Sequence, residues 1–301
     1  MKIIEYDISI FILYIKIFKQ NPRTIINHCR EGGKMNIVFW SECQGRCATS
    51  GNMLAVSIMS SLVYSVKGII MQFDNCSKAI DDVFEGKRQT NLLMEEYAYY
   101  SRKGIDDLLD KSQLKGISVE DIHSNAIPIK NTYISYIPVS KRMKSGLSDR
   151  EIIASAKKIM EALNETGGYN FIDCINGERS VTKNIVAHAD VVVVNICQGM
   201  NVDKLLISEQ VMKKAVFLVG KYDAESNENL SSICKKYNIS RERIVAIPYN
   251  IEFHDAMQEG RLVSFLTKQI MARRTDSNFA FINGVFKATD MILRRAGYRD
   301  E

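Results

Sequence analysis

The segment 41–50, with the sequence SECQGRCATS, combines small and polar residues with a glycine in the pattern of a phosphate-binding loop. It follows the apolar run 36–40, which predicts a buried strand. It precedes the segment 50–66, whose apolar residues recur at helical spacing. A loop that leads from a strand into a helix presents backbone N–H groups, and these groups bind anions. The pattern therefore predicts that a phosphate group is held at the start of this helix.

Acidic residues lie near the ends of two other apolar runs. Asp74 ends the run 68–74, and Asp173 lies near the end of the run 169–175. Ligands of parallel sheets lie beyond the carboxyl ends of the strands, so both carboxylates are expected to face the phosphate loop. Carboxylates in such positions bind magnesium directly or through water. The alternative role for an acid at a strand end is a helix cap. For Asp74 the cap and the magnesium role are weighed equally, whereas for Asp173 the magnesium role is favoured.

These residues require a scaffold, and from Met35 onward strand-like and helix-like segments alternate. We predict an α/β fold with a doubly wound, mostly parallel sheet of about seven strands. The predicted strands are 36–40, 68–74, 132–139, 169–175, 191–196, 215–222 and 244–249. The predicted helical segments are 50–66, 104–122, 149–165, 229–238 and 253–274. No internal repeat or low-complexity linker interrupts this alternation, so residues 35–301 are expected to form one domain.

Residues 1–34 do not follow this alternation and are expected to form an N-terminal extension. Their apolar run, ISIFILYIKIF, is too short to span a bilayer, and acid stands where a signal peptide carries positive charge. The codons for EGGK, directly before Met35, can contain a bacterial ribosome-binding sequence. One hypothesis is therefore that Met35 is the initiator and that residues 1–34 are not translated in the native host. The alternative is a short helical extension packed on the surface.

Composition narrows the class of protein. The chain has 301 residues, of which 46% are hydrophobic and 25% are charged, as expected for a globular protein. Its net charge of +5 is too small to indicate nucleic-acid binding, so no specific nucleic-acid partner is predicted. Seven cysteines without the spacing of a disulfide scaffold favour reduced thiols and a cytoplasmic location. Cys43 and Cys47 have no second ligand pair at zinc spacing, so no metal site made of protein ligands alone is expected.

The order of these motifs resembles that of the ParA/MinD-type (SIMIBI) P-loop ATPases, especially the TadZ/CpaE-like branch that localises pilus machinery. The resemblance covers nearly all of residues 35–270. The family loop reads Ser-Pro-Lys-Gly-Gly-x-Gly-Lys-Thr-Thr, and both of its lysines are replaced here, by Cys43 and Ala48. A backbone cradle still binds phosphate without them, whereas the lysines stabilise charge in the transition state. The resemblance therefore implies ATP binding with slow or absent hydrolysis.

The resemblance also implies a set of site residues for ATP and Mg²⁺. The phosphate loop and its partners are Gln44, Gly45, Arg46, Cys47, Ala48, Thr49, Ser50, Asp173 and the turn glycine Gly177. The implied adenine contacts are Lys221, Pro248 and Tyr249. Packing in a turn is the alternative for a tyrosine that follows a proline.

Within this set, Thr49 and Asp173 are the residues implied for magnesium, and Ser50 replaces Thr49 if the register slips by one residue. Arg46 is a cation close enough in sequence to replace the lost lysines in part. Asp74 is the candidate catalytic residue. Gln72 stands at the first acidic position of the family, which again weakens hydrolysis.

The function implied is that of an ATP-binding homodimer that positions or regulates a cell-envelope machine such as a Tad/Flp pilus. Its partners would be components of that pilus or secretion machine, in the cytoplasm or at the inner face of the membrane. The alternative is a pseudo-ATPase scaffold that binds no nucleotide and acts through protein contacts. A DNA-segregation ATPase is the least favoured alternative because both lysines are absent.

The segment 278–297 carries apolar residues at helical spacing with basic residues nearby. In MinD-like relatives a terminal amphipathic helix binds the membrane, and a basic-edged apolar face suits an anionic leaflet. Packing of this face on the domain is the preferred interpretation, because Gly284 and Asp290 interrupt it.

Overall fold

The structure is a computed structural model, and it describes residues 33–43, 45–73, 80–85, 104–139, 149–174, 180–200 and 208–299. Residues 1–32 of the expected N-terminal extension lie outside the described residues. Three residues of the predicted site, Gln44, Asp74 and Gly177, lie outside them as well.

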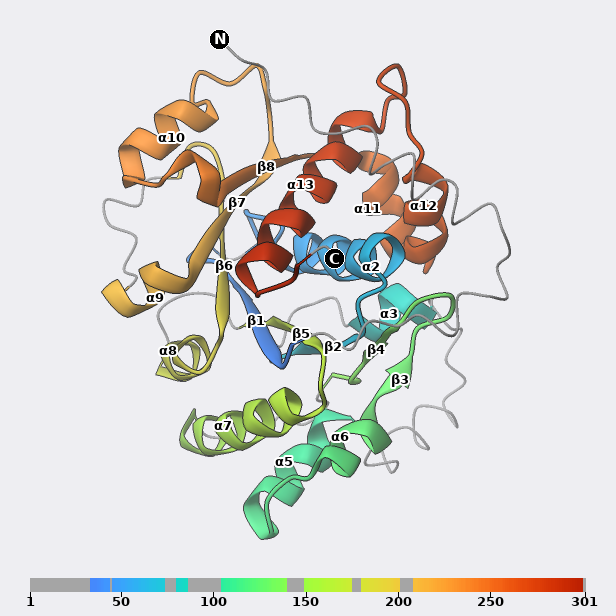
Figure 1. The fold of residues 1–301 in the computed structure, drawn as a ribbon, viewed down its shortest axis with the longest axis vertical. Coiled ribbons are helices and arrows are strands. Elements are labelled where there is room, and N and C mark those ends of the chain that lie inside the picture. Colours follow the sequence, from blue (N-terminus) through green and yellow to red (C-terminus); the bar gives the residue numbers. More distant parts are fainter. Residues whose placement is uncertain are drawn as a thin grey trace.

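An eight-stranded sheet runs through the centre of the molecule in the order β3-β4-β2-β5-β1-β6-β7-β8 (Figure 1). The strands are β1 (Met35–Trp40), β2 (Gly68–Gln72), β3 (Ile127–Pro128), β4 (Ile134–Tyr136), β5 (Tyr169–Asp173), β6 (Val191–Ile196), β7 (Ala215–Tyr222) and β8 (Ile244–Pro248). Neighbouring strands are parallel except β3, which pairs with β4 in the antiparallel direction. The carboxyl ends of the parallel strands therefore meet at one edge of the sheet.

Helices cover both faces of the sheet. They are α2 (Thr49–Tyr64), α3 (Ile80–Glu85), α5 (Ile105–Leu114), α6 (Val119–Asn125), α7 (Asp149–Glu165), α8 (Ser180–Ala187), α9 (Glu209–Lys214), α10 (Leu230–Tyr237), α11 (Ile251–Gln258), α12 (Leu262–Gln269) and α13 (Phe279–Arg295), with the 3₁₀ turn η2 (Arg241–Arg243). Side chains of β1 alternate between two hydrophobic clusters. Ile37 and Phe39 pack with α2 and α11–α13, whereas Val38 and Trp40 pack with α5–α8. This alternation follows from the two-residue period of a strand.

The predicted fold class is confirmed, and each of the seven predicted strands corresponds to an observed one. The strand that sequence reasoning missed is β3, whose two residues form only a short edge pairing. Two helical segments predicted as continuous are each split into two helices. Gly116, with φ of 92°, separates α5 from α6, and Gly260, with φ of 69°, separates α11 from α12. Both glycines adopt a left-handed conformation that ends a helix.

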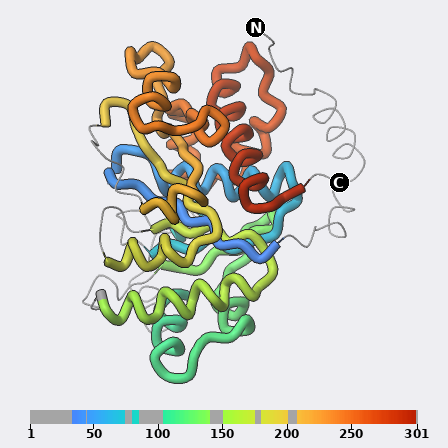
Figure 2. The backbone as a smooth tube through the Cα atoms, turned by 60° about the vertical axis from the view of Figure 1, so that its left-hand side comes forward, coloured from blue at the N-terminus to red at the C-terminus, as the bar shows by residue number. Residues whose placement is uncertain are grey.

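The last helix, α13, packs on the domain, which is the interpretation preferred from the sequence for segment 278–297. Ile282, Val285, Ile292 and Leu293 are buried in the core shared with α2. The two helices pack against each other, and Figure 2 draws α13 in red and α2 in light blue. A Cβ at Gly284 would lie 2.7 Å from the carbonyl oxygen of Ala246 in β8, so this glycine permits close approach to the sheet. Among the described residues, no helix combines the length and apolarity that crossing a bilayer requires.

Candidate functional site

The loop between β1 and α2 begins with a turn held by its own side chain. The Ser41 hydroxyl oxygen accepts a hydrogen bond from the backbone N–H of Cys43 at 3.1 Å. Gly45 and Arg46 are exposed, and Gly45 has a φ of 74°. A Cβ at Gly45 would meet no atom within 4 Å, so the space beside this part of the loop is open. The first N–H groups of α2 have no partner within the helix and are available to an anion there.

Ala48 precedes α2 in a left-handed conformation, with φ of 55° and ψ of 35°. This conformation costs a residue with a Cβ about 1–2 kcal/mol and is adopted readily by glycine. Ala48 therefore occupies a position whose backbone favours the glycine of a phosphate loop rather than its lysine.

The first turn of α2 is joined to the end of β5 through Asp173, which is 1% exposed. The Ser50 hydroxyl donates a hydrogen bond to Oδ2 of Asp173 at 2.5 Å. Nε2 of Gln72, at the end of β2, donates to the same oxygen at 3.2 Å. The structure thus brings Ser50, not Thr49, to the carboxylate, and it places Gln72 beside them.

These side chains offer suitable donors for a hard cation. Magnesium prefers hydroxyl and carboxylate oxygens and keeps several waters, and Ser50 with Asp173 supplies one oxygen of each kind. Gln72 is 2% exposed, and its buried Oε1 is an acceptor without a hydrogen-bond partner in the described part of the chain. Across the described residues, no group of three or more His, Cys, Asp or Glu side chains could hold a metal ion alone. The donor set fits a magnesium ion that arrives with a phosphate ligand.

Two buried asparagines support the loop through hydrogen bonds. Asn52 of α2 donates from Nδ2 to the Cys47 carbonyl at 3.2 Å and to Oδ1 of Asn195 at 2.8 Å. Asn195 lies in β6 and is fully buried. Sequence reasoning did not identify either residue, although Asn195 is a polar residue inside the otherwise apolar run 191–196. Such buried amides are kept in structures because their hydrogen bonds are satisfied.

The end of β7 touches the loop directly. A Cβ at Gly220 would lie 2.0 Å from the Cys47 carbonyl oxygen, so only glycine permits this contact. The next residue, Lys221, is exposed, and its Nζ lies 3.3 Å from the carbonyl oxygen of Gly45. The side chain predicted to contact adenine therefore lies against the phosphate loop.

The other predicted adenine contacts lie at the end of β8. Tyr249 is 54% exposed, and Pro248 is partly buried. A Cβ at Gly284 of α13 would lie 3.1 Å from Cδ of Pro248, which indicates that this proline packs close to the helix. Tyr249 remains available to a ligand at this edge of the sheet, whereas Pro248 contributes to the attachment of α13.

The two described cysteines of the loop, Cys43 and Cys47, have raised thiol pKa values. Burial raises the pKa of the Cys47 thiol to about 12, and the neighbouring Cys197 adds to the rise. Burial also raises the pKa of Cys43. The thiolate is the reactive form of cysteine, so a raised pKa makes a thiol inert. Cys47 acts as a small apolar residue that packs the loop.

We expect iodoacetamide at pH 8 to alkylate Cys47 at least about a hundredfold more slowly than Cys234, because burial and scarce thiolate both slow the reaction. Cys234 is half-buried on α10 and serves as the internal reference. Mass spectrometry of tryptic peptides during a time course measures both rates. Equal rates would mean that the loop opens in solution and exposes Cys47.

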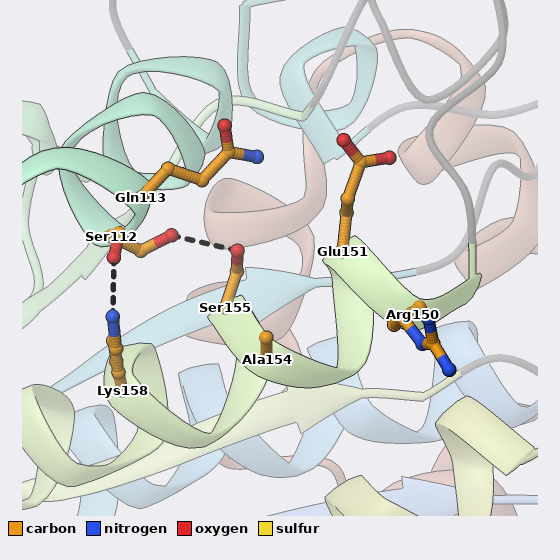
Figure 3. Close-up of a pocket in the computed structure, with 7 residues that line it drawn as sticks. All are labelled: Ser112, Gln113, Arg150, Glu151, Ala154, Ser155 and Lys158. Carbon is orange, nitrogen blue, oxygen red and sulfur yellow. Dashed lines mark hydrogen bonds between the residues drawn. The ribbon is translucent and has the colours of Figure 1, made fainter.

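A separate cavity of about 200 Å³ lies between α5 and α7 (Figure 3). The Lys158 ammonium donates to the Ser112 carbonyl at 2.5 Å, and the hydroxyls of Ser112 and Ser155 are hydrogen-bonded to each other at 2.7 Å. Lysine near the last turn of a helix satisfies free carbonyl groups there. These contacts attach α5 to α7, and the cavity is smaller than the sites that usually hold drug-sized ligands.

The fold is shared with solved structures of ATPases. The chain is similar to a ParA family ATPase from Chlorobium tepidum TLS, with a TM-score of 0.61 and 12% identity, over 87% of this chain and 98% of that one. It is similar to the septum site-determining protein MinD from Pyrococcus horikoshii OT3, solved with Mg-ADP, with a TM-score of 0.59, 12% identity and coverage of 87% and 98%.

A third similar structure is a putative plasmid partition protein from Borrelia burgdorferi B31 bound to AMPPNP. Its TM-score is 0.56 at 12% identity, over 87% of this chain and 99% of that one. No protein-family model matches the chain, and no curated protein matches its sequence. Likeness at this identity concerns the fold: the chain has the fold of the ParA/MinD P-loop ATPases.

Proposed function

We propose that this chain binds ATP with magnesium at the β1–α2 loop and works as a ParA/MinD-like positioning protein with slow or absent hydrolysis. The hydrogen bond between Ser50 and Asp173 carries this proposal. It joins a hydroxyl at the start of the phosphate-loop helix to a carboxylate at the end of the neighbouring strand β5, as a nucleotide-linked magnesium site requires. Bound magnesium would neutralise part of the phosphate charge.

Two features of the structure favour one alignment of the loop residues with the positions of the family motif. Ser50 bonds to Asp173, and Ala48 has the backbone conformation that favours glycine. Both observations align Ala48 with the glycine before the family lysine, Thr49 with that lysine and Ser50 with the first threonine. In this register the magnesium hydroxyl comes from Ser50, and the two lost lysines correspond to Gln44 and Thr49.

Hydrolysis is expected to be slow for two reasons. The loop has no lysine to stabilise charge in the transition state, and removing one such electrostatic group typically costs about a hundredfold or more in rate. Gln72 places an amide where the family has its first acidic residue, and an amide cannot act as a general base. Asp74 remains a proposed catalytic residue at the second acidic position.

The cellular role that we propose follows the resemblance to the TadZ/CpaE-like branch. A homodimer that binds ATP would change its contacts with components of a pilus or secretion machine at the inner face of the membrane. A nucleotide-free scaffold is the second candidate. It is favoured by the loss of both family lysines and by Gln72, an amide at the first acidic position of the family.

Isothermal titration calorimetry with ATP and ADP, with Mg²⁺ and with EDTA, separates the two candidates. We expect magnesium-dependent binding of ATP with little turnover in a phosphate-release assay. Absence of binding at millimolar nucleotide would favour the scaffold. Turnover equal to that of a fully equipped ATPase of this group would contradict slow hydrolysis.

Restoring a lysine tests the loop register. We expect Thr49→Lys to raise ATP affinity about tenfold, because a charge-assisted bond to phosphate would form at the lysine position. Ala48→Lys is the matched control and should bring no gain, because its backbone conformation disfavours a long side chain. Calorimetry of both variants measures the difference. A larger gain from Ala48→Lys would support the other alignment, in which Ala48 stands at the lysine position and Thr49 binds magnesium.

A further inference from the structure

The end of β7 brings a cation to a loop whose own lysines are missing. The Lys221 ammonium lies 3.3 Å from the Gly45 carbonyl oxygen, across a separation of 176 residues in the chain. Gly45 is exposed, with open space beside its α-carbon. An ammonium has three N–H donors, and the bond to Gly45 uses one of them. A ligand at the open side of the loop would therefore lie near a cation with further donors.

The backbone at Lys221 has an unusual conformation and lies at an irregularity in the pairing of β7 with β8. Its φ of 51° lies in the left-handed region, which is unfavourable for a residue with a Cβ. The pairing of β7 with β8 shifts register between Gly220 and Tyr222, and bulges of this kind re-aim side chains near functional sites. Gly220 lies directly against Cys47, so the strand end and the loop are in contact. Backbone strain that surrounding structure maintains is concentrated at ligand sites.

We propose that Lys221 supplies the positive charge that the phosphate loop lacks, and that its ammonium neutralises the phosphate groups of the bound nucleotide. This inference rests on the proposed function and gives Lys221 a phosphate role in place of contact with adenine. Arg46 is also exposed, but it lies within the loop, whereas Lys221 reaches the loop from β7. A cation held by the sheet keeps its position when the loop adjusts to a ligand.

The test compares nucleotides that differ in phosphate number. Lys221→Asn removes the charge, and asparagine tolerates the left-handed backbone, so the fold is preserved. Calorimetry with ATP, ADP and adenosine should show about a tenfold loss of affinity for ATP, a smaller loss for ADP and none for adenosine. Lys221→Arg should keep most of the ATP affinity, because it keeps the charge. The salt dependence of ATP binding should weaken in Lys221→Asn.

Lys115→Asn is the matched control, because Lys115 is an exposed lysine in the turn between α5 and α6. It should bind all three ligands like the wild type, and thermal unfolding should show that both variants are folded. The double variant Thr49→Lys with Lys221→Asn should recover ATP affinity, because the loop then carries its own cation.

Each other outcome has a distinct meaning. Unchanged ATP affinity in Lys221→Asn would overturn the phosphate role and leave the proposed function standing. Equal losses for ATP and adenosine would also overturn it, because Lys221 would then contact the base or only support the loop. A wild-type protein that binds no nucleotide would overturn the proposed function and this inference together.

Discussion

Replacement of Asp173 with asparagine is expected to remove most of the magnesium dependence of ATP binding. The wild-type carboxylate accepts a hydrogen bond from Ser50 and carries the negative charge that favours a nearby cation. Outer partners of a metal site typically contribute about 10–100-fold to metal affinity. The affinity for ATP in the presence of Mg²⁺ should therefore fall toward the affinity measured in EDTA.

The substitution is nearly isosteric, so the loss is not expected to arise from unfolding. The asparagine Oδ1 can still accept from Ser50 and Gln72, which keeps their hydrogen bonds satisfied. Asp190→Asn is the matched control, because Asp190 precedes β6 at the opposite edge of the sheet and accepts from the Asn36 backbone N–H at 2.7 Å. Calorimetry with Mg²⁺ and with EDTA on both variants decides the point. Full magnesium dependence in Asp173→Asn would place the cation elsewhere.

Replacement of Gly220 with alanine is expected to displace the phosphate loop and to abolish nucleotide binding. The added methyl group would lie 2.0 Å from the Cys47 carbonyl oxygen and 2.9 Å from Nδ2 of Asn52. Both atoms are part of the hydrogen-bonded support of the loop, so neither can move without breaking it. Overpacking of this kind costs about 1–3 kcal/mol, which lowers Tm by roughly 1.5 °C per kcal/mol in a chain of this size.

Gly51→Ala provides the comparison for this substitution. Gly51 lies in α2 close to the loop, and a Cβ there would meet Cε of Met257 at 3.6 Å, an ordinary contact. Alanine is favoured over glycine inside a helix by about 1 kcal/mol, so Tm should stay unchanged or rise. Thermal unfolding and calorimetry with ATP measure both variants. ATP binding by Gly220→Ala at the wild-type affinity would show that the contact with Cys47 does not shape the loop.

The sequence alone determined the fold class and the position of the loop, because both depend on local patterns. Apolar runs of strand length alternate with segments of helical spacing, and each predicted strand is present in the sheet. The position of Asp173 at a strand end was predictable for the same reason. Glycines that divide a helical segment, such as Gly116 and Gly260, were visible in the sequence. Their left-handed conformation was not, because glycine also occurs inside helices.

Only the tertiary structure decided which side chains meet at the site. Adjacent residues of a helix differ in direction by about 100°, so a one-residue change in the start of α2 decides whether Thr49 or Ser50 faces Asp173. Lys221 reaches the Gly45 carbonyl across 176 residues of chain, and Asn195 reaches Asn52 across 143. Such contacts depend on strand order, on the bulge at the end of β7 and on the absence of a side chain at Gly220. None of these features follows from the spacing of residues in the sequence, because contacts between distant segments form only when the strands assemble into one sheet.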